Sequence, residues 1–194
     1  MMRFLMKFSG AVAIVAFLGG CAVGNTYDFQ STAMQLPVKG AGQELNVKVI
    51  DNRPYVLNGK KAPSFIGLQR GGYGNPFDVN TSSGRPLSEE FRVAISRALE
   101  NSSYNVNDSA DKTVELTVRE WKTDAMMKLR LIYDLTLSIL TSDDELVASV
   151  TDAGDEVLGG ASFESANSQS ASSGFNRKIS RLFNREEIRD ALEE

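Results

Sequence analysis

The sequence predicts a single α+β domain in which an antiparallel-rich mixed sheet carries two main helices packed on one of its faces. Apolar residues occupy every second position over 127–139, which is typical of a half-buried antiparallel strand. Two segments, which begin at Pro86 and Phe175, instead place apolar residues at helical spacing. The length of 194 residues, with 42% apolar and 24% charged residues, fits one ordinary globular domain.

The first half of the domain is expected to contain two short strands and a helix. Alternating apolar and polar residues predict a strand over 44–50, and a second short strand is expected over 65–68. Residues 69–85 are rich in glycine but lack the Gly-Lys-Ser/Thr ending of a phosphate-binding loop, so they are interpreted as a turn-rich connection. The helix after Pro86 is predicted from apolar residues that share one helical face: Leu87, Phe91, Ala94, Ile95, Ala98 and Leu99.

The centre of the chain is predicted to be a run of strands. A brief strand over 104–106 and a strand over 114–118 precede the long strand of 127–139, with a turn expected near 122–125. Trp121 does not fit the alternation of 114–118. It therefore marks either a bulge in that strand or an exposed aromatic residue at the end of a hairpin.

The register of the next hairpin follows from the parity of its apolar residues. Those of the long strand have odd numbers, and those of the strand that follows have even numbers. A two-residue loop at Asp143-Asp144 brings odd positions opposite even ones, and it places Ile139 opposite Ala148.

The C-terminal part is expected to contain the second main helix. Residues 161–174 are small and polar, and they are interpreted as a mixture of strand end and loop. A helix is predicted from Phe175 onward. The sequence from Asn184 to Glu187 resembles a capping box, so we expect a short further helix in which Asn184 accepts the amide of Glu187.

The composition excludes several kinds of functional site. The chain has no histidine and one cysteine, so a Ser-His-Asp or Cys-His nucleophile, a zinc site of histidine and cysteine, and an intrachain disulfide are excluded. The net charge of −4 gives no electrostatic basis for binding nucleic acid. The acidic run 143–145 could bind a hard cation, but it lacks the ligand spacing of a calcium loop, and a solvated hairpin tip is favoured. We therefore predict no catalytic residue, no cofactor and no metal, and thus no enzyme.

The first twenty residues have the pattern of a secretory signal peptide. Arg3 and Lys7 precede an apolar run of eleven residues from Phe8 to Leu18, which is too short to span a bilayer core of about 20 residues. The small residues Gly19 and Gly20 suit a cleavage site. Removal of this segment takes the net charge from −4 to −6.

The sequence Leu18-Gly19-Gly20-Cys21 resembles the lipobox of bacterial lipoproteins. This resemblance implies a signal peptide over 1–20, lipid attachment at Cys21, a lipidated N-terminus and tether over 21–43, and a periplasmic domain over 44–194. Ala22, in place of the aspartate that retains enterobacterial lipoproteins in the inner membrane, implies the periplasmic face of the outer membrane. The alternatives are a plain secretory signal with an incidental cysteine, or a buried N-terminal helix.

Longer motifs resemble the YajG-type family of bacterial lipoproteins. They are the run Val47-Lys48-Val49-Ile50-Asp51-Asn52-Arg53, the pair Ile66-Gly67, the loop Gly71-Gly72-Tyr73-Gly74 and the C-terminal run Leu182-Phe183-Asn184-Arg185-Glu186-Glu187-Ile188. That family implies no established activity. The order of elements is also similar to that of the lipopolysaccharide-assembly lipoprotein and of auxiliary lipoproteins of ABC-type lipid transporters.

These observations predict a lipid-anchored, non-enzymatic interaction or accessory module in an outer-membrane assembly. Its partners are then the membrane, through Cys21, and an unknown envelope protein that contacts Arg70, Tyr73 and Phe77, because arginine and aromatic residues often anchor interfaces. The alternative is a periplasmic binding or transport-auxiliary lipoprotein for lipid, lipopolysaccharide or glycan, which would use the apolar layer between sheet and helices. Lys128 and Arg130 could contact phosphate or lipid headgroups, although such residues more often keep an exposed sheet face soluble.

Overall fold

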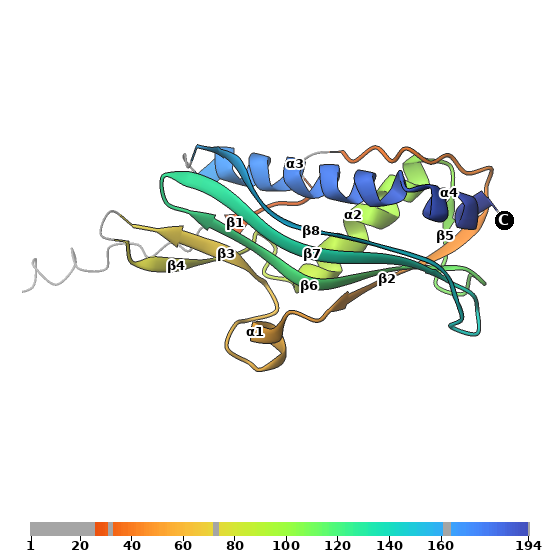
Figure 1. Ribbon diagram of the computed structural model, residues 1–194, viewed down its shortest axis with the longest axis horizontal. Coiled ribbons are helices and arrows are strands. Elements are labelled where there is room, and N and C mark those ends of the chain that lie inside the picture. Colours follow the sequence, from red (N-terminus) through yellow and green to blue (C-terminus); the bar gives the residue numbers. More distant parts are fainter. Residues whose placement is uncertain (1–25, 31–32, 72–73, 161–163, 194) are drawn as a thin grey trace, which may run out of the picture.

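A computed structural model describes residues 26–30, 33–71, 74–160 and 164–193 of the chain. Its strands form one mixed sheet, and the helices α2, α3 and α4 lie on one face of that sheet (Figure 1), which confirms the predicted α+β class. The elements in chain order are β1 (Thr26–Tyr27), β2 (Glu44–Asp51), α1 (Pro54–Leu57), β3 (Phe65–Arg70), β4 (Pro76–Thr81), α2 (Leu87–Asn101), β5 (Asn105–Val106), β6 (Thr113–Ala125), β7 (Lys128–Leu140), β8 (Leu146–Gly160), α3 (Glu164–Phe183) and α4 (Glu186–Glu193).

The long strand β6 organises the sheet. One edge of β6 pairs antiparallel with β7, which pairs antiparallel with β8. The other edge pairs in parallel with β2 along its first half and with β3 at its end. Beyond these strands, β4 pairs antiparallel with β3, β1 pairs in parallel with β4, and β5 pairs in parallel with β2.

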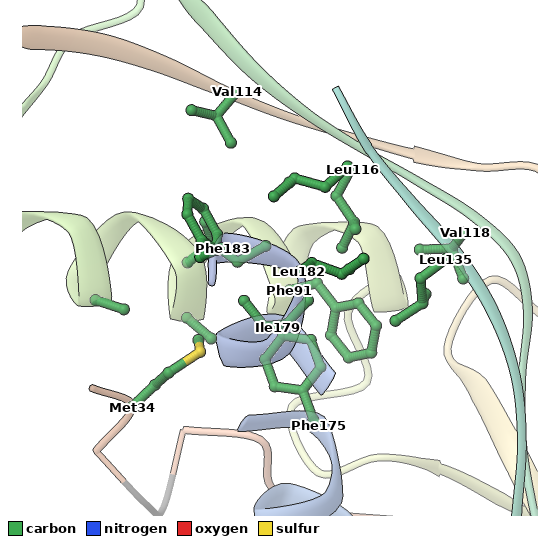
Figure 2. Packing of buried hydrophobic residues seen from close by; sticks show 14 of the residues in the cluster. Met34, Phe91, Val114, Leu116, Val118, Leu135, Phe175, Ile179, Leu182 and Phe183 are labelled. Atoms are coloured by element: carbon green, nitrogen blue, oxygen red, sulfur yellow. The ribbon is translucent and has the colours of Figure 1, made fainter. Parts of the chain in front are cut away.

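The core lies between the sheet and the helices. The odd positions of β7 from Leu129 to Ile139 are buried and the even ones are exposed or half-buried, as the alternation predicts. Figure 2 shows Leu135 beside the side chains that α2 and α3 send into the same cluster, among them Phe91 and Phe175. The rings of these two phenylalanines are stacked with centroids 4.0 Å apart.

We expect Leu135→Ala to lower the free energy of unfolding by about 2–5 kcal/mol, because it leaves a cavity in this core. Thr136→Ala, one residue further on the opposite face, should cost much less, because Thr136 is only half-buried. Urea unfolding of both variants measures the difference. Equal destabilisation would contradict the one-sided sheet.

The β7–β8 register is confirmed, but the loop that connects the strands differs from the prediction. Ile139 pairs with Ala148, as expected. The amide of Thr141 donates to the carbonyl of Glu145, so the loop has three residues instead of two, and Asp144 takes a positive φ of 58°. A bulge between Ile139 and Leu140 restores the odd-to-even pairing.

The predicted turn near 122–125 is wrong. Strand β6 continues to Ala125, and the chain reverses at Met126 and Met127, so Met127 is not part of the buried strand alternation. A bulge between Val118 and Glu120 shifts the alternation by one residue, which turns Trp121 into the core. The first interpretation of this tryptophan, a bulge, is therefore confirmed.

Two segments contain regular structure that the sequence pattern does not predict. Residues 69–85 contain the end of β3 and the strand β4, in which only Val79 and Thr81 are buried, so the apolar alternation is weak. Residues 164–174 belong to α3, whose small residues at Asn167 and Ala171 are buried in helical register with Phe175. Packing against the sheet outweighs the low helix propensity of this serine-rich segment.

Part of the segment expected to be a tether belongs to the folded domain. Tyr27 and Phe29 are buried, and the Phe29 ring packs edge-on against Phe91 and Trp121. Met34 and Val38 are also buried against the same core. These four side chains therefore belong to the folded domain, because burial in the core fixes them where no periodic pattern exists.

The expected cap at Asn184 is wrong. Helix α4 begins at Glu186, after Arg185, and the amides of Ile188 and Arg189 donate to the Arg185 carbonyl. Asn184 is exposed, and its own amide continues the hydrogen bonding of α3 by donating to the Ser180 carbonyl. The break between the helices is thus one residue later than the capping-box pattern indicates.

Candidate functional site at the hairpin end of the sheet

The end of the β3–β4 pair, at Arg70 and Pro76, lies beside the β6–β7 turn at Met126 and Met127, and we call this region the hairpin end. Gln69 of β3 pairs with Phe77 of β4 on one side and with Ala125 of β6 on the other. The ends of β3, β4 and β6 therefore lie beside one another, at the left of Figure 1. The residues predicted to contact a partner fall here.

The position of β3 depends on a gap in the sheet. Strand β2 leaves β6 after Asp51 pairs with Val118, and β3 joins β6 only where Gly67 pairs with Thr123. Between these points, the edge of β6 has neither β2 nor β3 beside it. The bulge of β6 lies in the same interval, which contains the Trp121 carbonyl.

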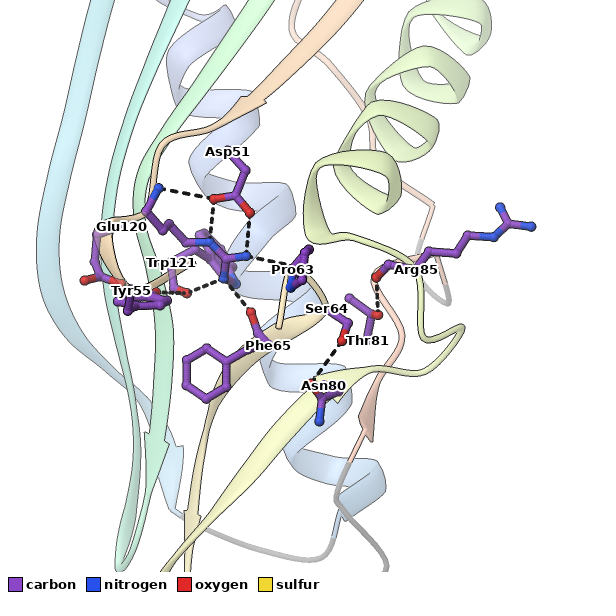
Figure 3. A network of polar contacts seen from close by, with 11 residues as sticks. Asp51, Tyr55, Pro63, Ser64, Phe65, Asn80, Thr81, Arg85, Glu120 and Trp121 are labelled. Carbon is purple, nitrogen blue, oxygen red and sulfur yellow. Dashed lines mark hydrogen bonds and ion pairs between the residues drawn. The ribbon is translucent and has the colours of Figure 1, made fainter. Parts of the chain in front are cut away.

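Arg53 fills this gap with hydrogen bonds that a strand would otherwise make. Its Nη1 donates to the carbonyl oxygens of Phe65, which opens β3, and of Trp121, at 3.5 Å (Figure 3). Its Nη2 donates to the Pro63 carbonyl at 3.1 Å. The guanidinium thus joins the start of β3 to β6.

Asp51 balances the charge of this buried guanidinium. Nε and Nη2 of Arg53 lie 2.8 and 2.7 Å from the two carboxylate oxygens of Asp51, a bidentate ion pair. Burial alone would lower the pKa of Arg53, but the hydrogen bond and the charge of Asp51 outweigh burial and raise it. All five N–H donors of Arg53 have acceptors in the chain, so none is left for a substrate.

Tyr55 completes this network. Its hydroxyl lies 2.5 Å from Oε1 of Glu120 and 3.1 Å from the Trp121 carbonyl. Burial raises the pKa of Tyr55, and the neighbouring Glu120 carboxylate raises it further. The phenol therefore keeps its proton at neutral pH, which fits a structural hydrogen-bonding role and not that of a general base.

The structure places two of the three predicted contact residues at the hairpin end. Arg70 is held by Asp124 of β6, with Nε–Oδ1 and Nη2–Oδ2 distances of 2.8 and 2.6 Å. The hydrogen bond from Arg70 is the main reason that the pKa of Asp124 is lowered. Phe77 is 49% exposed. Tyr73 and the proposed lipid-attachment residue Cys21 lie outside the described residues.

Sequence reasoning missed two further residues of this end. Met126 and Met127 form the β6–β7 turn and are 58% and 82% exposed. Two adjacent apolar residues between strands are an unusual turn sequence, and this was the signal that could have identified them. Because the turn was expected at 122–125, the two methionines were not considered as turn residues.

The carboxylates of β8 are engaged by α3 and β7. Asp152 lies 3.3 Å from Arg181, and Glu156 lies 2.7 Å from the buried Nζ of Lys178. Asp155 pairs with Arg130. Within the described residues, no group of three or more histidine, cysteine, aspartate or glutamate side chains is arranged to hold a metal ion.

One hollow among the described residues lies away from the hairpin end. It has a volume of about 500 Å³ and lies between the irregular segment 33–39 and the C-terminal end of α2, with Leu36, Lys39 and Ser103 in its wall. The lining residues include no carboxylate. The apolar layer between sheet and helices is, by contrast, filled by side chains such as Phe29, Phe91 and Trp121, and it is core. Among the described helices, none has the length and apolar character needed to cross a membrane.

Comparison with known proteins supports the fold alone. No family model and no curated protein matches the sequence. The crystal structure of protein XCC0632 from Xanthomonas campestris, of family DUF330, is similar with a TM-score of 0.58 and 16% identity over 81% of this chain and 91% of that one. Looser similarities are found to the PelC dodecamer of Paraburkholderia phytofirmans (TM-score 0.43, 14% identity, 78% and 96% coverage) and to lipoprotein GNA1162 of Neisseria meningitidis (TM-score 0.28, 13% identity, 71% and 98% coverage).

Proposed function

We propose that this protein is a lipid-anchored, non-enzymatic accessory module of a bacterial outer-membrane assembly. The observation that carries the proposal is the position of Cys21. It is the only cysteine, it follows the signal-like apolar run after two glycines, and it precedes the first described residue, Thr26, by five positions. Acylation there would hold the domain against the periplasmic face of the membrane.

The polar groups of the described domain support a role in interaction and not in catalysis. The buried cations Arg53 and Lys178 are each paired with a carboxylate of the chain. The accessible surface of the hairpin end instead offers Phe77 and the neighbouring Arg70, which suit contact with an envelope protein. The alternative function, binding of lipid, lipopolysaccharide or glycan, would find space in the hollow beside 33–39, whereas the apolar layer is occupied by core side chains.

We expect Cys21→Ser to abolish lipid attachment and removal of the signal by the lipoprotein route, because the acyl group has no other thiol to join. The variant should remain attached by its uncleaved signal or become soluble in the periplasm. Intact mass of the membrane-extracted protein and fractionation measure both effects. Ala22→Asp is the matched control, which should keep the lipid and move to the inner membrane. A wild-type mass equal to unmodified residues 21–194 would reject the proposal.

The accessory role is tested by site-specific crosslinking in intact envelopes. A photo-crosslinking residue in place of Phe77 should join the lipidated protein to one defined protein, because this ring is exposed at the proposed contact. The same residue in place of Leu146, at the opposite end of the sheet and 63% exposed, is the control. Identical products from both positions, or none from position 77, would refute this contact.

A further inference from the structure

The large exposed apolar side chains raise the question of which end of the domain faces the membrane. Phe77, Met126 and Met127 lie at the hairpin end, whereas Leu146 and Val147 lie at the far end of the β7–β8 hairpin. Both ends therefore expose apolar surface. Exposure alone does not distinguish them.

The length of chain before the folded domain makes the distinction. Strand β1 is parallel to β4, with Thr26 beside Asn80, so the chain enters β1 from the hairpin end. Phe77 precedes Asn80 by three residues and is therefore about 10 Å nearer that end. The five residue steps from Cys21 to Thr26 span at most about 18 Å when fully extended. An anchor at Cys21 thus cannot hold the membrane more than a few ångströms beyond the hairpin end.

The chemistry of the β6–β7 turn suits a lipid surface. Met126 and Met127 are flexible apolar side chains that stand in solvent. Lys128 follows them directly, is exposed and makes no ion pair within the described residues. The other cations of residues 122–130 are Lys122 and Arg130; Arg130 is paired with Asp155, and the one carboxylate of this stretch, Asp124, is paired with Arg70. Apolar residues flanked by cations bind the interface of membranes that contain anionic lipids.

We propose that the β6–β7 turn is a second, non-covalent membrane contact, in which Met126 and Met127 enter the lipid interface and Lys128 meets anionic headgroups. The inference rests on the proposed lipid anchor, because Cys21 is what brings this end to the bilayer. This contact gives the domain a fixed orientation. The hairpin end faces the membrane, and the β7–β8 turn is directed away from it.

The test uses the full lipidated chain in vesicles of phosphatidylethanolamine and phosphatidylglycerol. Since acylation consumes the thiol of Cys21, Met127→Cys introduces the single free thiol for a polarity-sensitive fluorophore. Leu146→Cys is the matched control at the opposite end. The label at 127 should shift its emission to shorter wavelength and be quenched by nitroxide-bearing lipids, whereas the label at 146 should respond only to an aqueous quencher. Met126→Asp beside the label at 127 should reverse the shift.

The outcomes separate this inference from the proposed function. Protein that floats with the vesicles but shows equally water-exposed labels at 127 and 146 would overturn the membrane contact and leave the anchor intact. Protein that carries no acyl group and does not float would overturn both. Protection of the label at 127 in native envelopes but not in pure lipid would assign the turn to a protein partner, and this too would overturn the lipid contact.

Discussion

Replacement of Arg53 by methionine is expected to lower the free energy of unfolding by about 3–5 kcal/mol, because it removes one partner of a buried ion pair. The variant would leave the Asp51 carboxylate without its cation. It would also remove the donors that serve the carbonyls of Pro63, Phe65 and Trp121. Urea unfolding can be followed by the fluorescence of Trp121, which is the only tryptophan and is buried beside this network.

Arg119→Met is the matched control for this substitution. Arg119 also forms a bidentate ion pair: its Nε and Nη2 donate to the two carboxylate oxygens of Asp134. This pair lies on the exposed face of the sheet. Because that pair is exposed to solvent, its loss should cost no more than about 1 kcal/mol. Equal effects of the two substitutions would show that Arg53 does not join β3 to β6. A double change, Asp51→Leu with Arg53→Met, should recover only part of the loss, because the carbonyls stay without donors.

Gly67→Ala is expected to destabilise the protein by about 3 kcal/mol or more, at or above the upper end of the usual cost of overpacking. A Cβ at this position would lie 2.0 Å from Oγ1 of Thr123 and 2.5 Å from the Thr123 carbonyl oxygen. The hydroxyl could rotate away, but the carbonyl belongs to the backbone of β6. The parallel pairing of β3 with β6, and with it the hairpin end, should therefore weaken.

Gly159→Ala in β8 serves as the control, because a Cβ there has no heavy atom within 4 Å. Its effect on the free energy of unfolding should stay within about 0.5 kcal/mol. Thermal or urea unfolding of both variants gives the comparison. If Gly67→Ala unfolds like the wild type, then β3 does not approach β6 as closely as the register of Gly67 with Thr123 requires.

The features that could be predicted from the sequence depend on local periodicity. The alternation in β7, the apolar face of α2 and the pairing of Ile139 with Ala148 all follow from residue spacing within one or two neighbouring elements. A buried face requires apolar residues at the period of its own secondary structure, and the sequence therefore displays it directly.

The hairpin end could be predicted only in part. Arg70 and Phe77 were identified by residue type, but the pairing of Arg70 with Asp124 joins residues far apart in the chain. Met127 is predicted to lie in the long strand but forms the turn with Met126, because the bulge before Trp121 interrupts the alternation that would have located this turn. One extra residue in a strand changes which face every later side chain occupies.

The sequence by itself determined the lipobox-like segment, the α+β class and the faces of β7 and α2, because each follows from the order and spacing of residues within one short segment. The tertiary structure alone decided that Tyr27, Phe29, Met34 and Val38 join the core, that the serine-rich start of α3 is helical, and that β8 continues through Asp152 and Glu156. Those segments have no apolar period of their own. They are ordered by partners distant in the chain, such as Phe91 for Phe29 and Lys178 for Glu156, and such pairings exist only after the sheet has brought them together.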